Sequence, residues 1–485
     1  MVNSHVHQEV ELPSDGVEAV IKNEESSHTR PLGLMDLPID IFNQILETLD
    51  SIAKQETREI YDQNYKSRVE IAGPADQKRY NTYLHQNSPI LNSFQAFAIT
   101  SPEIYQHCQP RLWQFPSSLP APIDLWTNDL LVRQGSHVQS LSLNLSENCS
   151  KPPGEFIEHH PSYDNLSFQN YMGARTACVS PKTVKDLIES CPNLSSMNIE
   201  YYEGGTEAFL SNLIPSLSNL KNFRHLKFKD GNLDACMKEF PSKLADGLPL
   251  LESLDFMGFR GFGDDGKIGD GSFGSHLSKL KHLSQLHLSH ISDLNESWCV
   301  YEWPRTITDL AIDHCGHFSP ISAYLLVHSI APEVKKLALR FVQRNDEECW
   351  KIDPIGDHQC RFSLPFLTDL ELSTKNPNSL RSFQDCISIT NLRWDYRTSA
   401  HCQTLNDILF QATWPHLKKL MVVDHTWIFG ANIRLEPQAC DSLIDSLEKH
   451  CKRLGSPVPL CSRYIDQEMT QILLLLSCWS DLSDT

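Results

Sequence analysis

One short pattern of apolar positions recurs ten times between Val138 and Val422: an apolar residue, two others, a second apolar residue, one other, and a third apolar residue. The second and third apolar positions are two residues apart, so in an extended strand their side chains point to the same side. One such unit cannot bury its apolar edge alone, and the recurrence therefore predicts a solenoid of stacked units. The ten copies are Val138/Leu141/Leu143, Leu194/Met197/Ile199, Phe223/Leu226/Phe228, Leu251/Leu254/Phe256, Leu283/Leu286/Leu288, Ile307/Leu310/Ile312, Val334/Leu337/Leu339, Leu367/Leu370/Leu372, Ile389/Leu392/Trp394 and Leu417/Leu420/Val422.

The spacing between the copies sets the expected number of units. Their middle residues lie 56, 29, 28, 32, 24, 27, 33, 22 and 28 residues apart. Because the first gap is twice 28, we expect it to contain one degenerate or missing repeat. The segment Ser146–Ser180 lies in that gap, and its sequence leaves open whether it is an insertion or a broken repeat.

Between the copies, apolar residues follow helical spacing, and proline or a turn usually comes next. Proline ends a helix because it has no backbone N–H to donate. The alternation of strand, turn and helix predicts an α/β fold, a horseshoe with a parallel sheet inside and helices outside. The expected helices include Val184–Ser190, Glu207–Leu217, Ile321–Ile330 and Leu405–Phe410.

From about Val138 to Leu454 the chain resembles the leucine-rich-repeat family. That family usually places Asn or Cys five residues after the middle Leu, where the side chain bonds buried backbone, and here only Cys315 occupies the position. The resemblance implies a long concave surface that binds other macromolecules. The alternative is that the pattern arises by chance in a leucine-rich α/β protein.

A second informative stretch runs from Leu37 to Leu49, and Pro38 is well placed to begin a helix there. Apolar residues then recur at helical spacing. A further helical stretch, Ile90–Tyr105, is followed by Leu112 and Trp113. Together these segments resemble an F-box, the small helical module that docks on the Skp-type adaptor of SCF ubiquitin ligases.

The F-box resemblance implies roles for particular residues. The adaptor-facing residues would be Leu37, Pro38, Ile41, Ile45, Leu46 and Leu49. The middle helix would be built by Leu91, Phe94 and Ile99, with Leu112 and Trp113 closing the module. The alternative is a plain helical cap on the first repeat, since terminal repeats need capping.

This N-terminal module departs from the compact F-box pattern by a polar, charged insertion, Ser51 to Asn87. We expect Ser51–Glu70 to continue as a solvated helix and Gly73-Pro74 to break it. The insertion either loops out, since longer loops add little closure entropy, or covers the docking face.

Composition narrows the possible partners and compartments. The formal charge is −19, from 61 acidic and 42 basic residues, whereas nucleic-acid binders usually carry a basic footprint. We therefore expect no nucleic-acid partner and no membrane association, and a cytoplasmic or nuclear location. The 15 cysteines then act as free, mostly buried small hydrophobes.

The expected organisation has five parts. Residues 1–30 form a disordered acidic tail, 31–115 the F-box-like module, 116–137 a connector, 138–454 the solenoid and 455–485 a C-terminal cap or tail. The run Ile472–Leu476, far too short to span a bilayer, is expected to cap the last repeat with Ile465 and Met469.

The sequence offers no residues on which to rest an enzymatic mechanism. It contains neither the GxSxG nor the HExxH pattern. The segments His314–His317 and Cys349–Cys360 lack the paired spacing of a zinc site, and the glycine-rich Arg260–Gly271 lacks P-loop or EF-hand spacing. We therefore expect no catalytic residue, metal or cofactor.

The residues beside the buried strand positions should face the concave side. Their charges alternate in sign from repeat to repeat, which suits a protein ligand with its own mixed charge pattern. Aromatic residues at or near strand ends are hot-spot candidates. The candidate substrate-binding residues are Tyr201, Tyr202, Lys227, Lys229, Arg340, Arg393, Tyr396 and Trp427.

These features lead to one expected function and one alternative. The chain would be the substrate-recognition subunit of an SCF-type ubiquitin ligase, binding a Skp-type adaptor, through it a cullin scaffold, and a protein target of unknown identity. The alternative is a leucine-rich-repeat interaction scaffold without a ligase role.

Overall fold

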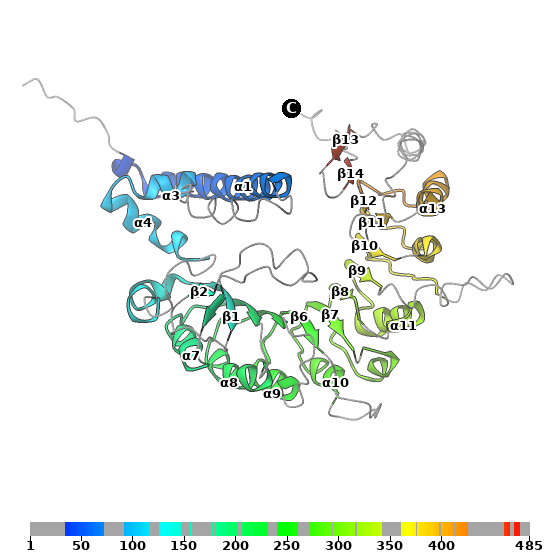
Figure 1. Ribbon diagram of the computed structural model, residues 1–485, viewed down its shortest axis with the longest axis horizontal. Coiled ribbons are helices and arrows are strands. Elements are labelled where there is room, and N and C mark those ends of the chain that lie inside the picture. The colour runs from blue at the N-terminus through cyan, green and yellow to red at the C-terminus, as the bar shows by residue number, and fades with distance from the viewer. Residues whose placement is uncertain are drawn as a thin grey trace, which may run out of the picture.

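The curved parallel sheet predicted from the repeats lies on the inside of a horseshoe, and the helices lie on its outside (Figure 1). The computed structural model describes residues 34–71, 92–115, 126–146, 156–157, 176–178, 181–201, 206–230, 240–259, 272–292, 294–315, 318–341, 360–374, 376–396, 399–411, 413–424, 460–465 and 470–475. The α/β leucine-rich-repeat architecture expected from the sequence is therefore confirmed.

The described strands form one 14-stranded sheet in the order β13-β14-β12-β11-β10-β9-β8-β7-β6-β5-β4-β1-β3-β2. From β1 through β4 to β12, neighbouring strands are parallel and equivalent repeat positions lie in register. The strands are β1 Ser140–Ser146, β2 Phe156–Ile157, β3 Thr176–Cys178, β4 Ser196–Tyr201, β5 His225–Asp230, β6 Ser253–Phe259, β7 Gln285–Ile291, β8 Asp309–Asp313, β9 Lys336–Arg340, β10 Asp369–Ser373, β11 Asn391–Tyr396, β12 Lys419–Asp424, β13 Leu460–Ile465 and β14 Thr470–Leu475.

The apolar triplets build the core of the solenoid. Every triplet residue whose side chain is described, which is all but Val422, is buried, and the most exposed of them, Leu417, is 6% exposed. Burying one such side chain contributes about 1.5–3 kcal/mol.

The expected helices are also present, as α7 Pro181–Glu189, α8 Thr206–Ser218, α11 Pro320–Ile330 and α13 Ser399–Phe410, together with α9 Phe240–Gly247, α10 Phe273–Leu277 and the 3₁₀ segments η5 Glu296–Val300 and η6 Pro377–Phe383.

A ladder of shared carbonyls joins the repeats at the start of each strand. The carbonyl oxygen of Ser195, for example, accepts the N–H groups of Arg224 and His225 at 2.8 and 3.0 Å. The residue equivalent to Ser195 does the same in each neighbouring pair, up to the carbonyl of Thr390. The ladder satisfies the turn backbone in most repeats without the Asn or Cys of the family pattern, and side-chain hydroxyls such as that of Thr368 add to it.

Cys315, which alone matches the family pattern, behaves as that pattern implies. Its buried thiol lies 3.8 Å from the carbonyl oxygen of Leu288 in the preceding repeat and 3.5 Å from that of Asp313. Burial raises the pKa of this thiol to about 12. Cys315 is therefore a neutral, structural side chain that helps to join two repeats.

Of the alternatives for the 56-residue gap, a degenerate repeat between the first two copies is wrong. Strand β1 pairs directly with β4, with Leu141 opposite Met197, so no strand lies between them. The gap instead sends β3 to the other edge of β1, and β2 pairs antiparallel to β3 beyond it. Among the described strands, none from an earlier repeat lies beside β1, and the short strands β3 and β2 cover that edge instead.

The N-terminal helices have a core of their own. They are α1 Ile39–Ile71, α3 Ser93–Ala98 and α4 Pro102–Leu112, and their buried cluster is separate from that of the solenoid. As expected, α1 continues through the first part of the insertion and ends two residues before Gly73. The rest of the insertion lies outside the described residues.

At the other end of the sheet, β13 and β14 form an antiparallel pair that extends it beyond β12. Strand β14 includes Ile472 and β13 ends at Ile465, so both lie in the C-terminal cap as expected. Met469 and Leu476 lie outside the described residues. The last repeat is therefore covered by strands rather than by a further repeat.

The direct contact between the first two repeats generates a stability prediction. A Cβ added at Gly135 would lie 1.9 Å from the backbone oxygen of Ser190, at the end of α7. Because that oxygen is backbone, we expect Gly135→Ala to destabilise the chain by about 1–3 kcal/mol and to lower its thermal unfolding midpoint.

The matched control is Gly247→Ala, where the added atom would lie 2.3 Å from the Cγ2 methyl of Ile214, a side-chain group rather than backbone. It should lower the midpoint less than Gly135→Ala does. Equal midpoints for Gly135→Ala and the parent chain would contradict the placement of β1 beside β4.

Candidate functional site

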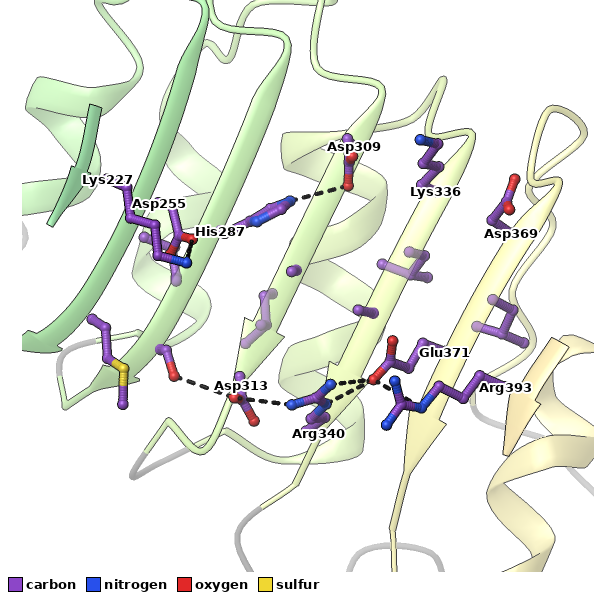
Figure 2. A pocket seen from close by; sticks show the side chains of 18 of the residues that line it. Lys227, Asp255, His287, Asp309, Asp313, Lys336, Arg340, Asp369, Glu371 and Arg393 are labelled. Atoms are coloured by element: carbon purple, nitrogen blue, oxygen red, sulfur yellow. Dashed lines mark hydrogen bonds and ion pairs between the residues drawn. The ribbon is translucent and has the colours of Figure 1, made fainter. Parts of the chain in front are cut away.

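The concave face carries the side chains that a partner would meet. Equivalent positions of successive strands form three rows, which we name after their positions in the strand: the first row includes Asp309 and Lys336, the middle row Lys227 and Asp255, and the last row Asp313. The strands enclose an open hollow of about 1350 Å³ (Figure 2). The described residues that line it include six lysines and arginines and six aspartates and glutamates, so together they are formally neutral within a chain of charge −19.

Charges from neighbouring repeats pair across the strands in the N-terminal half of this face. Lys227 Nζ lies 2.7 Å from Asp255 Oδ2 in the middle row, and Lys229 Nζ lies 3.5 Å from Glu200 Oε1 in the last row. The Lys227–Asp255 pair is the more exposed of the two, and such a pair contributes about 0–1 kcal/mol. Their main effect is to leave little net charge at these positions.

A continuous chain of ion pairs crosses the C-terminal half of the face. Arg340 lies between Asp313, at 3.5 Å, and Glu371, with which it forms a short bond. Arg393 Nε lies 3.6 Å from the same oxygen of Glu371. Figure 2 shows these four side chains pointing toward one another from β8, β9, β10 and β11, two acids and two bases that neutralise each other.

Two histidines beside these ion pairs adopt an unusual backbone conformation. His290 and His314 have φ of 55° and 52°, and Gly258, at the equivalent place in β6, has φ of 92°. Left-handed backbone costs a non-glycine residue about 1–2 kcal/mol. The two imidazole rings stack with centroids 5.4 Å apart, and His314 Nδ1 forms a short contact with Asp313.

The electrostatic surroundings shift the pKa of two groups in this cluster. Burial lowers the pKa of the half-buried His290, as does the neighbouring His314, while Asp313 opposes them. Burial alone would raise the pKa of Asp313, but the hydrogen bond from His314 and the charges of His314, Arg340 and His290 bring it below its usual value.

The structure places four of the predicted substrate-binding residues on this face. Lys227, Lys229, Arg340 and Arg393 line the hollow. Tyr201 and Tyr396 end β4 and β11, but their side chains lie outside what the structure describes, as do Tyr202 and Trp427 entirely.

Sequence reasoning missed several residues of this face, including Asp255, His287 and Ser289. A signal for them was available in the repeat spacing, because Asp255 and His287 are equivalent to Lys227, and Ser289 is equivalent to Lys229. Ala311 and Ala338 also line the middle row. They carry no charge or aromatic ring, so a search for polar and aromatic residues passes over them.

The N-terminal module presents a second surface. On α1, Phe42 and Leu46 are each 2% exposed and pack in the module core. Ile41 and Ile52 are 40% and 43% exposed, and Ile45 between them is partly exposed. Spacings of four and seven residues place these three isoleucines on one side of the helix, next to the buried stripe.

The predicted adaptor-facing residues therefore divide into two groups. Pro38 and Ile41 are exposed, and Leu37 and Ile45 are partly exposed. Leu46 is buried and Leu49 packs against the module core, so these two support the surface from beneath rather than forming it. Phe94 is buried as expected, Ile99 is 65% exposed rather than packed in the middle helix, and Leu91 lies outside the described residues.

Hydrogen bonds across the insertion keep the module together. The carboxylate of Glu56 on α1 accepts the backbone N–H of Ser93 at 2.7 Å and also the Ser93 hydroxyl, at the start of α3. These bonds lower the pKa of Glu56. Asn92 and Gln95 complete a reciprocal capping box at the same helix end. The insertion thus leaves α1 and α3 in direct contact.

The described residues show neither a metal site nor a membrane-spanning helix. They contain no group of three or more His, Cys, Asp and Glu side chains placed to bind a metal ion. No helix within them combines the length and apolar character needed to cross a bilayer.

Comparison with known proteins adds little to these observations. No protein-family profile matches the chain, and no curated protein matches it. One solved structure that matches is the crystal structure of a TLR13–ssRNA13 complex, with 14% sequence identity and a TM-score of 0.30 over 56% of this chain. This chain covers 38% of that protein's chain. We draw no functional conclusion from so distant a likeness.

The low pKa of His290 generates a pH prediction. Because the folded state disfavours the protonated ring, the unfolded chain binds the proton more readily, and stability should fall as pH drops through about 6.5. His290→Asn removes this term while keeping a residue that tolerates positive φ. We expect the thermal midpoint of the variant to fall less than that of the parent between pH 7.5 and pH 5.5.

The exposed His282, on a turn away from the concave face, is the control position. His282→Asn should leave the parent's pH dependence unchanged. A His290→Asn chain that loses as much stability in acid as the parent would contradict the prediction.

Proposed function

We propose that this chain is the substrate-recognition subunit of an SCF-type, cullin–RING ubiquitin ligase. The N-terminal module would dock on a Skp-type adaptor and through it on a cullin, and the concave face would bind a protein target. The fold supports the general part of this proposal, a scaffold for protein interaction. The specific part starts from the F-box-like residues between Leu37 and Trp113.

One observation carries the specific part: the exposed apolar line on a module that has its own core. Ile41, Ile45 and Ile52 remain accessible although α1 also supplies a fully buried stripe to the module. Met35 and Ile39, near the start of this helix, are 42% and 62% exposed. Accessible apolar side chains grouped on one small module are typical of a docking surface.

In this proposal the chain does no bond chemistry. It binds adaptor and target at two different surfaces, which raises the concentration of the target near the ubiquitin-charged enzyme on the same scaffold. The module and the first repeat are joined by hydrogen bonds, because the carbonyl of Gln114 accepts the N–H groups of Gln139 and Ser140 at 3.0 and 3.1 Å. The two surfaces are therefore connected through structured backbone.

The same junction favours the second candidate, an interaction scaffold whose N-terminal helices only cap the solenoid. Gln114 supplies the first step of the carbonyl ladder, and Trp113 packs against Trp126 with ring centroids 5.8 Å apart. A cap would make these contacts without any adaptor. Binding to the adaptor separates the two candidates.

The test is co-purification of the full chain with a Skp-type adaptor, followed by titration. We expect the parent to bind and Ile41→Asp/Ile45→Asp to bind at least about tenfold more weakly, because two charges would be placed in an apolar contact. Circular dichroism and the thermal midpoint establish that the variant is folded.

Ile387→Asp is the matched control, because Ile387 is 57% exposed but lies on a turn of the solenoid between η6 and β11. It should bind the adaptor like the parent. A folded parent that does not bind the adaptor would reject the ligase proposal in favour of the scaffold.

A further inference from the structure

Most of the charges described on the concave face form an ion pair with a side chain of a neighbouring repeat, and the described exceptions fall in one row. Among the described residues lining the hollow, no carboxylate lies within 4.0 Å of the ammonium group of Lys336 or Lys419. Asp369 accepts hydrogen bonds from the neutral Asn391 and Thr368 side chains. Asp309 contacts the ring of His287, which is charged only when protonated.

These four side chains all belong to the first row. Asp309, Lys336 and Asp369 are direct partners in the register of β8, β9 and β10, and Lys419 occupies the same position in β12. Asn391 stands between the last two. Figure 2 shows Asp309, Lys336 and Asp369 side by side at one end of their strands. From β8 to β12, the first row is therefore negative, positive, negative, neutral and positive, and its four charged side chains form no ion pair with a lysine, arginine or carboxylate among the described residues.

The spacing of this row fits a helix better than an extended segment. Strands lie about 4.8 Å apart, so the four charges stand at about 0, 5, 10 and 19 Å along the row. One face of a helix, at 1.5 Å per residue, presents positions i, i+3, i+7 and i+14 at about 0, 5, 11 and 21 Å. One face of an extended strand presents a side chain about every 6.8 Å, so its second side chain would already miss the charge at about 5 Å.

We propose that the concave face binds a helix of a partner protein, laid across β8 to β12, with charges that alternate at the spacing of the first row. A basic residue of the helix would face Asp309, an acidic one Lys336, a basic one Asp369 and an acidic one Lys419. The proposal rests on the proposed function only in naming the partner as a ligase target. Complementary charges of this kind set specificity more than affinity.

The alternation itself favours a protein over a nucleic acid. A polyanion would bring a negative charge against Asp309 and Asp369 as often as against the two lysines. A protein helix can alternate its charges to match.

The probe is a sixteen-residue peptide held helical by a hydrocarbon staple on its opposite side. Over a neutral background it carries lysine at its first and eighth positions and glutamate at its fourth and fifteenth. A second peptide has the four charges inverted. Fluorescence anisotropy with the full chain, at low ionic strength and without adaptor, measures both affinities. We expect at least a tenfold preference for the first peptide, shrinking as salt is added.

A charge-swap variant tests the assignment of residues. Asp309→Lys/Lys336→Asp/Asp369→Lys/Lys419→Asp should reverse the preference to the inverted peptide. Lys227→Asp/Asp255→Lys is the control, because this pair is neutralised internally and should keep the parent's preference after exchange. Circular dichroism checks the folding of both, and if the fourfold variant is unfolded, Lys336→Asp alone should reduce the preference.

Three results would overturn the proposal: no preference in the parent, the same preference in the folded charge-swap variant, or tighter binding of a single-stranded RNA of sixteen nucleotides than of either peptide. None of them bears on adaptor docking, which is measured separately at the N-terminal module. Failure of the helix proposal is therefore distinguishable from failure of the ligase proposal.

Discussion

The shared-carbonyl ladder is the interaction on which the rest of this structure depends. One carbonyl per repeat accepts two consecutive N–H groups of the next, as that of Thr308 does from Lys335 and Lys336 at 2.8 and 3.0 Å. Each such bond adds only about 0.5–1.5 kcal/mol of net stability, but together they link the strands of successive repeats, β1 and β4 to β12, in one register. A slip of one residue would exchange the buried and concave positions, so the register determines which side chains form the interaction surface.

The core and the outer helices could be predicted because buried positions are occupied by apolar residues, whose spacing is visible in the sequence. The triplet Ile307/Leu310/Ile312, for example, is apolar at all three positions and fully buried. The topology of the 56-residue gap has no comparable residue pattern. The sequence does not show to which edge of β1 an extended segment adds, and in the described sheet β4 takes one edge and β3 the other. Spacing arithmetic alone therefore suggested a repeat that is absent from the described sheet.

The concave surface was predictable as a set of positions but not as a pattern of net charge. The alternation of acids and bases is visible in the sequence, yet it does not show which charges pair. Arg340 reaches both Asp313 and Glu371, whereas Lys336, four residues earlier on the same strand, reaches no carboxylate among the described residues. The difference depends on side-chain length and the offset between rows, which only the three-dimensional register supplies. The left-handed backbone of His290 and His314 could not be predicted from the sequence either, because glycine rather than histidine is the residue that indicates positive φ.

Because the N-terminal module and the solenoid have separate cores, each can present its own exposed surface. The module keeps an exposed line of isoleucines because its own helices, with the Glu56–Ser93 hydrogen bonds, already satisfy its buried stripe. The solenoid can vary the side chains in the three concave rows because these positions lie outside the apolar triplets. At Trp113 and Gln114 the two units meet, and there the first carbonyl of the ladder is supplied by the module itself. In the proposed ligase, this junction would set the direction in which a target bound to the sheet faces relative to the adaptor, so a change there would alter the geometry of both surfaces without touching either one.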